Sequence, residues 1–473
     1  MFGVDIVPCL QTLAHLKSVL KQPAFENYKD IDDILLLDDP KSKKLLQSLL
    51  KTVSECFSSG IVHLGMDEAM NLGRGRYLDL HGLVQPVEIM KRHLAWLETE
   101  CTKLELKPMI WSDMYLEFFF GVEDYYGISE DAKPQNNENL SKNIALCYWD
   151  YQNETTDFYE KYIGVHQKLG NTIVFAGGAW TWNGIAPNVS KAAKTTRDAL
   201  DACISKKIKD IFCTVWMDNG AETPLETCLP TLALYGEYGY GNRPTEEEVE
   251  QRFRSVFQRN YADYAILDAF DNIENKLNGS VSECNNKYAV NPSKTILYED
   301  PLMGQFCTTF NEKVMKEHYK NLQKLLDLKE TEDIVMIYYK TLAAILYIKA
   351  NLSEEIKLAY KQKDKNGLKK NIQSLSEIET LTNRLADLRA EIWMRDDKPF
   401  GYEVLDIRMA GVSARCKSAR HRIQNYLDEK IDSIPELEAI ILPVRTEEML
   451  QKEALHGYYI WDRIISNCNI DGI

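Results

Sequence analysis

Two adjacent carboxylic acids, Asp67 and Glu68, are the side chains of this sequence best suited to chemistry. They lie in the segment HLGMDEA at 63–69, after a β-branched run that predicts a strand over 61–65. Adjacent side chains on a regular strand point to opposite faces, so both acids can reach one site only where the strand has ended. Gly65 gives the backbone the freedom for that change of direction.

Two carboxyl groups in one pocket repel each other, and this repulsion moves their pKa values apart. One group then stays protonated as an acid while the other remains a carboxylate, as acid–base catalysis requires. The alternative is a solvated acidic turn, because an Asp-Glu dipeptide is common. A second one, Asp428–Glu429, lies in a helical context, and we assign it no role.

Tryptophans gather at the ends of the predicted strands. Five of the eight tryptophans in the chain follow such ends, where parallel β/α folds hold their functional residues. Any one of them could be a packing residue, but barrel interiors mostly use Val, Ile and Leu. The set therefore favours an aromatic pocket for a neutral ring, formed by Trp111, Trp149, Trp180, Trp182 and Trp216.

The elements that would position these side chains alternate between strand and helix. Amphipathic segments such as 87–97 and 192–204 separate short β-branched or aromatic runs. This alternation predicts a parallel α/β domain over residues 1–240. The six predicted strands cover residues 4–8, 61–65, 108–111, 144–149, 172–176 and 210–216.

From about residue 241 the pattern changes to long charged helices. Thr245 and Glu248 have the spacing of a capping box, which predicts the start of a helix. We therefore predict an α-helical domain over 241–473. Its main helices are expected at 312–328, 332–350, 353–364, 368–391 and 414–426.

Composition narrows the classes of partner. The formal net charge is −15, with 45% apolar and 27% charged residues, which is typical of a soluble globular protein. An acidic chain argues against sequence-independent binding to nucleic acid or to an anionic membrane. We expect no nucleic-acid or membrane partner; a neutral substrate fits the charge.

Cysteines and histidines give no sign of a metal site. The 11 cysteines are odd in number and the 8 histidines are dispersed, without metal-ligand spacing. We expect free thiols in a reducing compartment, hence a cytoplasmic protein without metal or cofactor. The first residues of this chain, MFGVDIVPCL, do not have the pattern of a signal peptide.

The segment HLGMDEAMNLGRGRY resembles the catalytic segment of glycoside hydrolase family 20, the β-N-acetylhexosaminidases, whose pattern is His/Asn-x-Gly-x-Asp-Glu. The resemblance extends in the same order over the chain and points to the hexosaminidase D-like branch. It implies a TIM-type (β/α)₈ barrel followed by a C-terminal helical domain. The segments that carry it are VPCLQTLAHL, PMIWSDMY, YWDY, AGGAWTWNG, TVWMDNGAETP and WMRDDKPFGYEVLDIR.

The resemblance also implies a reaction: hydrolysis of terminal β-linked GlcNAc or GalNAc from a glycan, with retention and without metal. In this family the 2-acetamido oxygen of the sugar attacks its own anomeric carbon. Glu68 would be the general acid and then the base, and Asp67 would orient the acetamide N–H. Tyr151 would donate to the acetamido oxygen, and the five tryptophans would surround the sugar.

Five further residues are candidates around that sugar. By the resemblance, Asp218 and Glu222 could bind its 4- and 6-hydroxyl groups. Gln11, His15 and His63 lie at or beyond strand ends, where a supporting role is as plausible as sugar contact.

The sequence also departs from the family. A closed barrel needs eight strands, and the six predicted here correspond to strands three to eight. We therefore expect strands one and two, with a sugar-binding arginine, upstream of Met1. We also expect this chain alone to be poorly soluble or to self-associate, for example as a homo-oligomer.

Three alternatives remain open at this stage. The chain could be a catalytically impaired carbohydrate-binding relative that keeps both acids. It could be a metal-dependent barrel hydrolase that uses His63, Asp67 and His15. It could also be a truncated scaffold with the ancestry of the enzyme and an incomplete fold.

Overall fold

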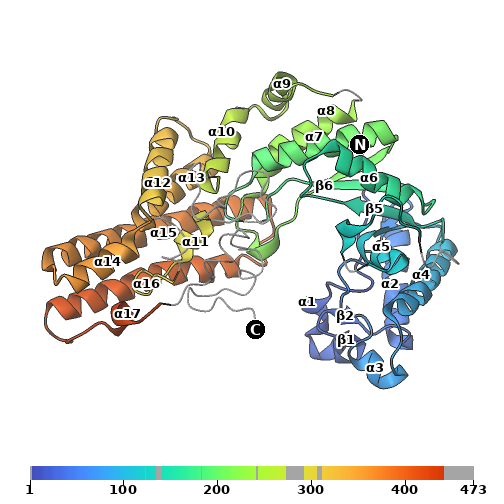
Figure 1. The fold of residues 1–473 in the computed structure, drawn as a ribbon, viewed down its shortest axis with the longest axis horizontal. Helices are drawn as coiled ribbons and strands as arrows, with labels where there is room; N and C mark the ends of the chain where they lie inside the picture. Colours follow the sequence, from blue (N-terminus) through green and yellow to red (C-terminus); the bar gives the residue numbers. More distant parts are fainter. Residues whose placement is uncertain are drawn as a thin grey trace. The chain divides into compact units, whose positions relative to one another are not determined.

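The computed structural model describes residues 3–122, 124–134, 141–182, 184–240, 243–272, 292–305 and 312–441. The chain forms two compact units. The first unit comprises residues 1–177 and 197–212, and the second comprises residues 178–196 and 213–473. Figure 1 shows the elements along the chain.

The central feature is a five-stranded sheet whose strands follow one another in sequence order, β3-β4-β5-β6-β7. The paired strands β3 to β6 run parallel. Helices connect the strands, which gives an α/β fold compatible with part of a TIM-type barrel. The strands are β3 (Ile61–His63), β4 (Lys107–Trp111), β5 (Ala145–Trp149), β6 (Ile173–Gly178) and β7 (Asp210–Thr214).

Five of the six predicted strands are confirmed, and the first one, at 4–8, is wrong. In its place Cys9 forms an isolated parallel bridge with His63. Pro8 has no N–H to donate, and its carbonyl only accepts from His63 N–H at 2.9 Å. Residues 4–7 are exposed, so no buried face specifies a strand there.

Two helices of the first unit begin at residues whose side chains cap them. Asp39 caps one of them by accepting the N–H of Lys41 at 2.8 Å, with Pro40 as the first helical residue. Thr155 caps another by accepting the N–H of Phe158 at 3.3 Å. The helices include α2 (Pro40–Cys56), α4 (Pro86–Lys103), α5 (Asp113–Phe120) and α6 (Thr156–Gln167); α7 (Val189–Lys206) spans both units.

An unpredicted two-stranded antiparallel ribbon precedes the parallel sheet. It consists of β1 (Lys29–Ile31) and β2 (Ile34–Leu35). Two short helices, α1 (Lys17–Leu20) and α3 (Arg76–His81), lie before and after β3 in sequence. Elements this short leave little periodic signal, which is why the sequence did not predict them.

The core of the first unit includes an apolar cluster on the parallel strands. Trp111, Cys147, Val174 and Ala176 are buried together. Met109, Ala145, Trp149 and Phe212 pack against them and remain partly exposed. The cluster holds neighbouring strands in register through side chains that point to the same face.

The second unit is dominated by long helices, as predicted. The longest, α15, packs along α16 and α13 (Figure 1). The capping box at Thr245 and Glu248 is confirmed, with Thr245 N–H donating to Glu248 Oε2 at 2.7 Å. The helices are α8 (Leu229–Gly239), α9 (Glu246–Phe257), α10 (Tyr261–Ala265), α11 (Pro292–Tyr298), α12 (Glu312–Asp327), α13 (Ile334–Lys349), α14 (Leu352–Lys361), α15 (Lys365–Asp396), α16 (Glu403–Leu427) and α17 (Pro435–Glu438).

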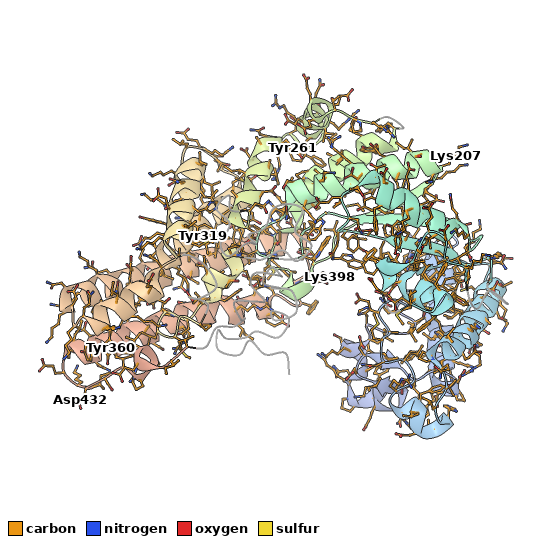
Figure 2. The ribbon with its side chains drawn as sticks, in the orientation of Figure 1. Lys207, Tyr261, Tyr319, Tyr360, Lys398 and Asp432 are labelled. Carbon is orange, nitrogen blue, oxygen red and sulfur yellow. The ribbon has the colours of Figure 1, made fainter. Side chains whose placement is uncertain are left out.

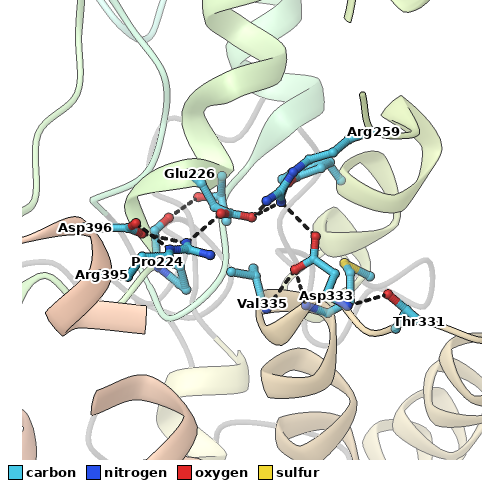
Figure 3. A network of polar contacts seen from close by, with 11 residues as sticks. Pro224, Glu226, Arg259, Thr331, Asp333, Val335, Arg395 and Asp396 are labelled. Atoms are coloured by element: carbon cyan, nitrogen blue, oxygen red, sulfur yellow. Dashed lines mark hydrogen bonds and ion pairs between the residues drawn. The ribbon is translucent and has the colours of Figure 1, made fainter. Parts of the chain in front are cut away.

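A polar network joins several of these helices at Glu226 (Figure 3). Its Oε2 accepts from Arg395 Nη2 at 2.6 Å, and its Oε1 accepts from Arg259 and from the hydroxyl of Tyr264. Arg259 also donates to Asp333, the N-cap of α13, at 2.7 Å. The network therefore ties three helices to the segment before α8.

Tyrosine hydroxyl groups make further contacts between elements of the helical unit. Tyr319 on α12 is fully buried and donates its hydroxyl to the carbonyl of Phe270 at 2.9 Å (Figure 2). Tyr360, in α14, donates to Glu438 at 2.5 Å and accepts the N–H of Ile434 at 3.0 Å. These contacts hold α17 against the end of α14.

The predicted domain boundary at 240/241 stays a prediction, because residues 241–242 lie outside the described part of the chain. The same is true of the predicted helical domain beyond residue 441. Within the described ranges, no helix is long and apolar enough to cross a membrane.

Candidate active site

The loop after β3 has an unusual backbone at the acid pair. Gly65, Met66 and Glu68 have φ angles of 68°, 79° and 52°. Residues other than glycine rarely adopt a positive φ, and the backbone strain at Met66 and Glu68 is of a kind that clusters at functional sites. A Cβ on Gly65 would lie 1.9 Å from Gln11 Oε1, so any other residue here would displace the Gln11 side chain and would also have to adopt a φ of 68°.

The segment before β1 reaches this loop because it runs beside the end of β3. The N–H of Leu10 donates to the carbonyl of His63 at 2.7 Å. Thr12 donates to the carbonyl of Leu64 with both its N–H, at 3.2 Å, and its hydroxyl, at 2.7 Å. These bonds place Gln11 and the following residues next to the acids.

Asp67 is held on both carboxylate oxygens. Gln11 Nε2 donates to Oδ1 at 3.2 Å, and His15 Nε2 lies 3.2 Å from Oδ2. The same His15 nitrogen lies 3.6 Å from Glu68 Oε2. The Glu68 side chain is 54% exposed against 17% for Asp67, so Glu68 is the more accessible acid. The structure thus brings four sequence-predicted residues together.

His15 supplies positive charge to the pair. Its hydrogen bond to Asp67 raises its pKa to about 9, against the opposing effect of burial, and the charges of Asp67, Glu68 and Asp33 add to the increase. The backbone N–H of His15 donates to Asp33 Oδ2 at 3.1 Å. At neutral pH an imidazolium therefore faces both carboxylates.

Asp113 is a buried acid of the site that the sequence did not single out. It is the first residue of α5 and is 3% exposed. Its Oδ2 accepts the N–H of Glu68 at 3.0 Å, and its Oδ1 accepts Trp149 Nε1–H at 3.3 Å. Burial, and then the charge of Asp67, raises its pKa to about 7. Its signal was the acid in PMIWSDMY, just beyond a strand end.

Trp149, the last residue of β5, forms a stacked pair with Tyr151. Their ring centroids are 5.4 Å apart and their planes differ by 26°. Trp149 also stacks on Tyr125, at 5.5 Å and 26°. Because Trp149 donates to the same carboxylate as the Glu68 backbone, this aromatic pair belongs to the neighbourhood of the acids.

His63 and Trp111 have supporting positions in the structure. Burial lowers the pKa of His63 to about 4, so its ring is neutral. Its Nδ1 accepts the N–H of Gly65 at 3.0 Å, which leaves the proton on Nε2. The ring lies 4.5 Å from that of Trp111, which is 4% exposed and belongs to the apolar cluster. A sugar contact by either residue stays a prediction.

The unpredicted ribbon supports the segment that follows the acids. Asp30 on β1 accepts the N–H of Gly73 at 3.1 Å and that of Tyr77 at 2.7 Å. A Cβ on Gly75 would lie 2.4 Å from the carbonyl oxygen of Asp30, so the two backbones approach closely. The ribbon thus holds the chain at Gly73 and Tyr77, beyond the loop that carries Glu68.

Three of the predicted tryptophans lie in the second unit. Trp180 and Trp182 stack at 5.0 Å with planes 26° apart, and Lys191 Nζ lies 5.1 Å from the Trp180 ring centre. Thr181 donates its hydroxyl to the carbonyl of Trp216 at 3.0 Å. Because Asp67 and Glu68 belong to the first unit, a pocket shared with these tryptophans stays a prediction.

The other two candidates follow β7 in the second unit. Asp218 begins a short 3₁₀ turn, Asp218–Gly220. Glu222 is 2% exposed; its Oε2 lies 2.5 Å from Lys294 Nζ and its Oε1 lies 3.1 Å from Arg408 Nη1. The hydroxyl of Tyr298 donates to the same Oε1.

Glu222 is therefore a buried carboxylate held by two cations, which is typical of a residue that stabilises the fold. Burial opposes its ionisation, but Lys294 and Arg408 outweigh burial and hold the pKa of its carboxyl below the usual value. Arg389 fixes the adjacent backbone, donating to the carbonyls of Ala221 at 2.7 Å and Glu222 at 3.1 Å. The predicted sugar contact of Glu222 stays untested.

Comparison with known families gives a match in the C-terminal region. Residues 262–456 match the model of the glycoside hydrolase 20C C-terminal domain. No curated protein matches the chain.

Solved structures resemble the chain only partially. The chitobiase from Flavobacterium johnsoniae has 14% identity and a TM-score of 0.37, over 95% of this chain and 66% of its own. A β-N-acetylhexosaminidase from Bacteroides fragilis has 12% identity and a TM-score of 0.36, over 54% and 53%. A Vibrio harveyi exo-β-N-acetylglucosaminidase has 14% and 0.27, over 39% and 27%.

The chain thus spans less than two thirds of each of these three structures. The relationship rests on the C-terminal match, which lies outside the first unit and its acid pair. That match supports a relationship of this chain to glycoside hydrolase family 20.

Proposed function

We propose that this chain is an exo-acting glycoside hydrolase that removes terminal β-linked GlcNAc or GalNAc from glycans, with retention and with help from the acetamido group of the sugar. The observation that carries the proposal is the presentation of Asp67 and Glu68 together on a strained loop after β3. The family match at 262–456 supports the same class of reaction.

Glu68 is the general acid of this proposal. Its side chain is 54% exposed, which suits a group that must reach the glycosidic oxygen of a bound glycan. It protonates the leaving oxygen as the anomeric bond breaks, and the resulting carboxylate then takes a proton from water. The bond from its N–H to Asp113 fixes the backbone from which the side chain extends.

Asp67 serves the acetamide group. As the acetamido oxygen attacks the anomeric carbon, positive charge develops on the amide nitrogen, and a carboxylate beside it stabilises this charge. Gln11 and His15 already hold the two oxygens of Asp67. Each oxygen has a second lone pair, so the acetamide N–H can still be accepted.

The aromatic pair supports the same substrate. Tyr151 would donate its hydroxyl to the acetamido oxygen, and the Trp149 ring would pack against an apolar C–H face of the sugar. Asp113 orients the Trp149 ring through the indole N–H.

The proposal also covers where the protein acts and what it requires. The described cysteines are free thiols, which agrees with the cytoplasmic location suggested by cysteine usage. We propose a glycan as the substrate and no role for nucleic acid, membrane, metal or cofactor in the reaction.

The test is hydrolysis of aryl β-GlcNAc and aryl β-GalNAc, followed by ¹H NMR from the first minutes. We expect release of the sugar first as its β-anomer, before mutarotation. A matched variant, Glu429→Gln, alters the Asp-Glu pair that follows α16 and should leave the rate unchanged. Absence of hydrolysis, or the α-anomer as first product, would overturn the proposal.

A further inference from the structure

We propose that Asp113 is a positioning residue of this site, whose carboxylate fixes the backbone of Glu68 and the indole ring of Trp149 at the same time. The inference rests on the proposed function, because it assigns those two partners to catalysis and sugar binding. It adds a third acid whose task is geometry rather than proton transfer.

The geometry of Asp113 supports this role. Each of its oxygens accepts one bond, Oδ2 from Glu68 N–H at 3.0 Å and Oδ1 from Trp149 Nε1–H at 3.3 Å. One donor, Glu68, lies in the loop after β3, and the other, Trp149, is the last residue of β5. The carboxylate comes from the start of α5, after β4. A single rigid group therefore links three successive strand ends.

The side chains of Ser112 and Asp113, at the start of α5, bond to residues outside that helix. Ser112, at the N-cap, makes no side-chain cap and instead lies 3.0 Å from the hydroxyl of Tyr125 and 2.9 Å from His166 Nε2. Tyr125 in turn stacks on Trp149. Asp113 therefore contacts Trp149 directly, and Ser112 contacts it through Tyr125.

The chemistry of the donors makes the carboxylate specific. A backbone N–H and an indole N–H can only donate, so both positions at residue 113 must be acceptors. An asparagine offers one acceptor and one NH₂ group, and its NH₂ group would face a donor whichever way the amide is turned. Asp113→Asn therefore loses one of the two bonds and keeps the size of the side chain.

The stability of the folded protein does not explain why an acid is buried at position 113. Asp113 is almost fully buried, and the charges acting on it include the carboxylates Asp67 and Glu68. Burying a carboxyl group next to two others is unfavourable in the folded state. Features that break such a rule are expected at functional sites.

The experiment compares two aryl β-GlcNAc substrates, one with an activated and one with a poor leaving group. A displaced Glu68 protonates the leaving oxygen less well, so Asp113→Asn should raise the ratio of the two kcat values, activated over poor, by about 10-fold or more. This ratio does not depend on how much of the variant is folded. Asp113→Glu keeps both acceptors and should change the ratio less.

Asp30→Asn is the matched control. Asp30 is also buried, and each of its oxygens also accepts one N–H, from Gly73 and Tyr77. It should lower both rates by one factor and leave their ratio unchanged. Equal ratios in Asp113→Asn and Asp30→Asn would overturn the proposal.

A second readout is independent of activity. With 5-fluorotryptophan incorporated, the ¹⁹F resonance of Trp149 is assigned by its loss in Trp149→Phe. Asp113→Asn should shift this resonance, and Asp30→Asn should leave it in place. An unmoved resonance in Asp113→Asn would overturn the positioning role, whereas an inactive wild type with a shifted resonance would overturn the proposed function alone.

Discussion

Two glutamates, each in the loop after a strand of the five-stranded sheet, have opposite surroundings. Glu222, after β7, is 2% exposed and is bound by Lys294, Arg408 and Tyr298. Glu68, after β3, has a side chain that is 54% exposed and lies on strained backbone, with His15 at 3.6 Å. Each description holds within its own unit.

This difference separates a glutamate that stabilises the fold, Glu222, from one that we propose acts on a substrate, Glu68. A buried charge is tolerated only when cations and hydrogen bonds satisfy it, and Glu222 meets that condition. A group that must exchange a proton with a substrate needs access, and Glu68 has it. Sequence position alone does not distinguish the two, because both follow a strand end.

The largest effect is expected on the activity of Glu68→Gln. Turnover of substrates with poor leaving groups should fall about 10²- to 10⁴-fold, because they need protonation. Activated aryl glycosides should lose much less, and the melting temperature should stay close to that of the wild type. Steady-state kinetics on both substrates decides this, and equal losses would remove Glu68 as the proton donor.

The second effect is on the stability of Glu222→Gln. Loss of this charge leaves Lys294 and Arg408 buried without their anion, which should cost about 3–5 kcal/mol of unfolding free energy. Urea denaturation measures it. The double variant Glu222→Gln/Lys294→Met restores the net charge of the cluster and should be the more stable one. A single variant as stable as the wild type would contradict the architectural role.

The smallest effect concerns the charge of His15. Its pKa in the folded protein, about 9, exceeds the ordinary value of 6.5, so its protonated form contributes stability below pH 6.5. That contribution is lost as the pH rises through about 9. The melting temperature should therefore fall more over this range in the wild type than in His15→Gln.

His421→Gln is the control for this pH series, because His421 is exposed on α16. It should retain the full fall of the wild type. If His15→Gln and the wild type showed identical slopes, His15 would not be bound as a cation by the acid pair.

Much of the fold was predictable, because β-branched runs and helical periodicity are local properties. The strand at 4–8 failed because Pro8 cannot donate and the residues before it have no buried face. The sequence predicts the start of α16 at 414, but the helix begins at Glu403. Gly411 lies between these two positions, and its low helix propensity weakens the helical pattern there. Burial of Leu405 and Met409 overrides that weakness.

The site was predictable only in part. Asp67 and Glu68 stand out because a motif and a strand end coincide. Asp113 was missed because its partners, Glu68 and Trp149, lie far from it in sequence, after β3 and at the end of β5. The buried partners of Glu222 lie far along the chain, at Lys294 and Arg408, and no local pattern reports such contacts.

The central claim is that the acetamido group of the substrate takes part in the reaction beside Asp67. The most direct measurement compares kcat/KM for an aryl β-GlcNAc and for the matching aryl β-glucoside, whose 2-position carries a hydroxyl group. We expect the glucoside to be a very poor substrate, and we expect Asp67→Asn to slow greatly only the GlcNAc substrate. Comparable rates for the two sugars would contradict it.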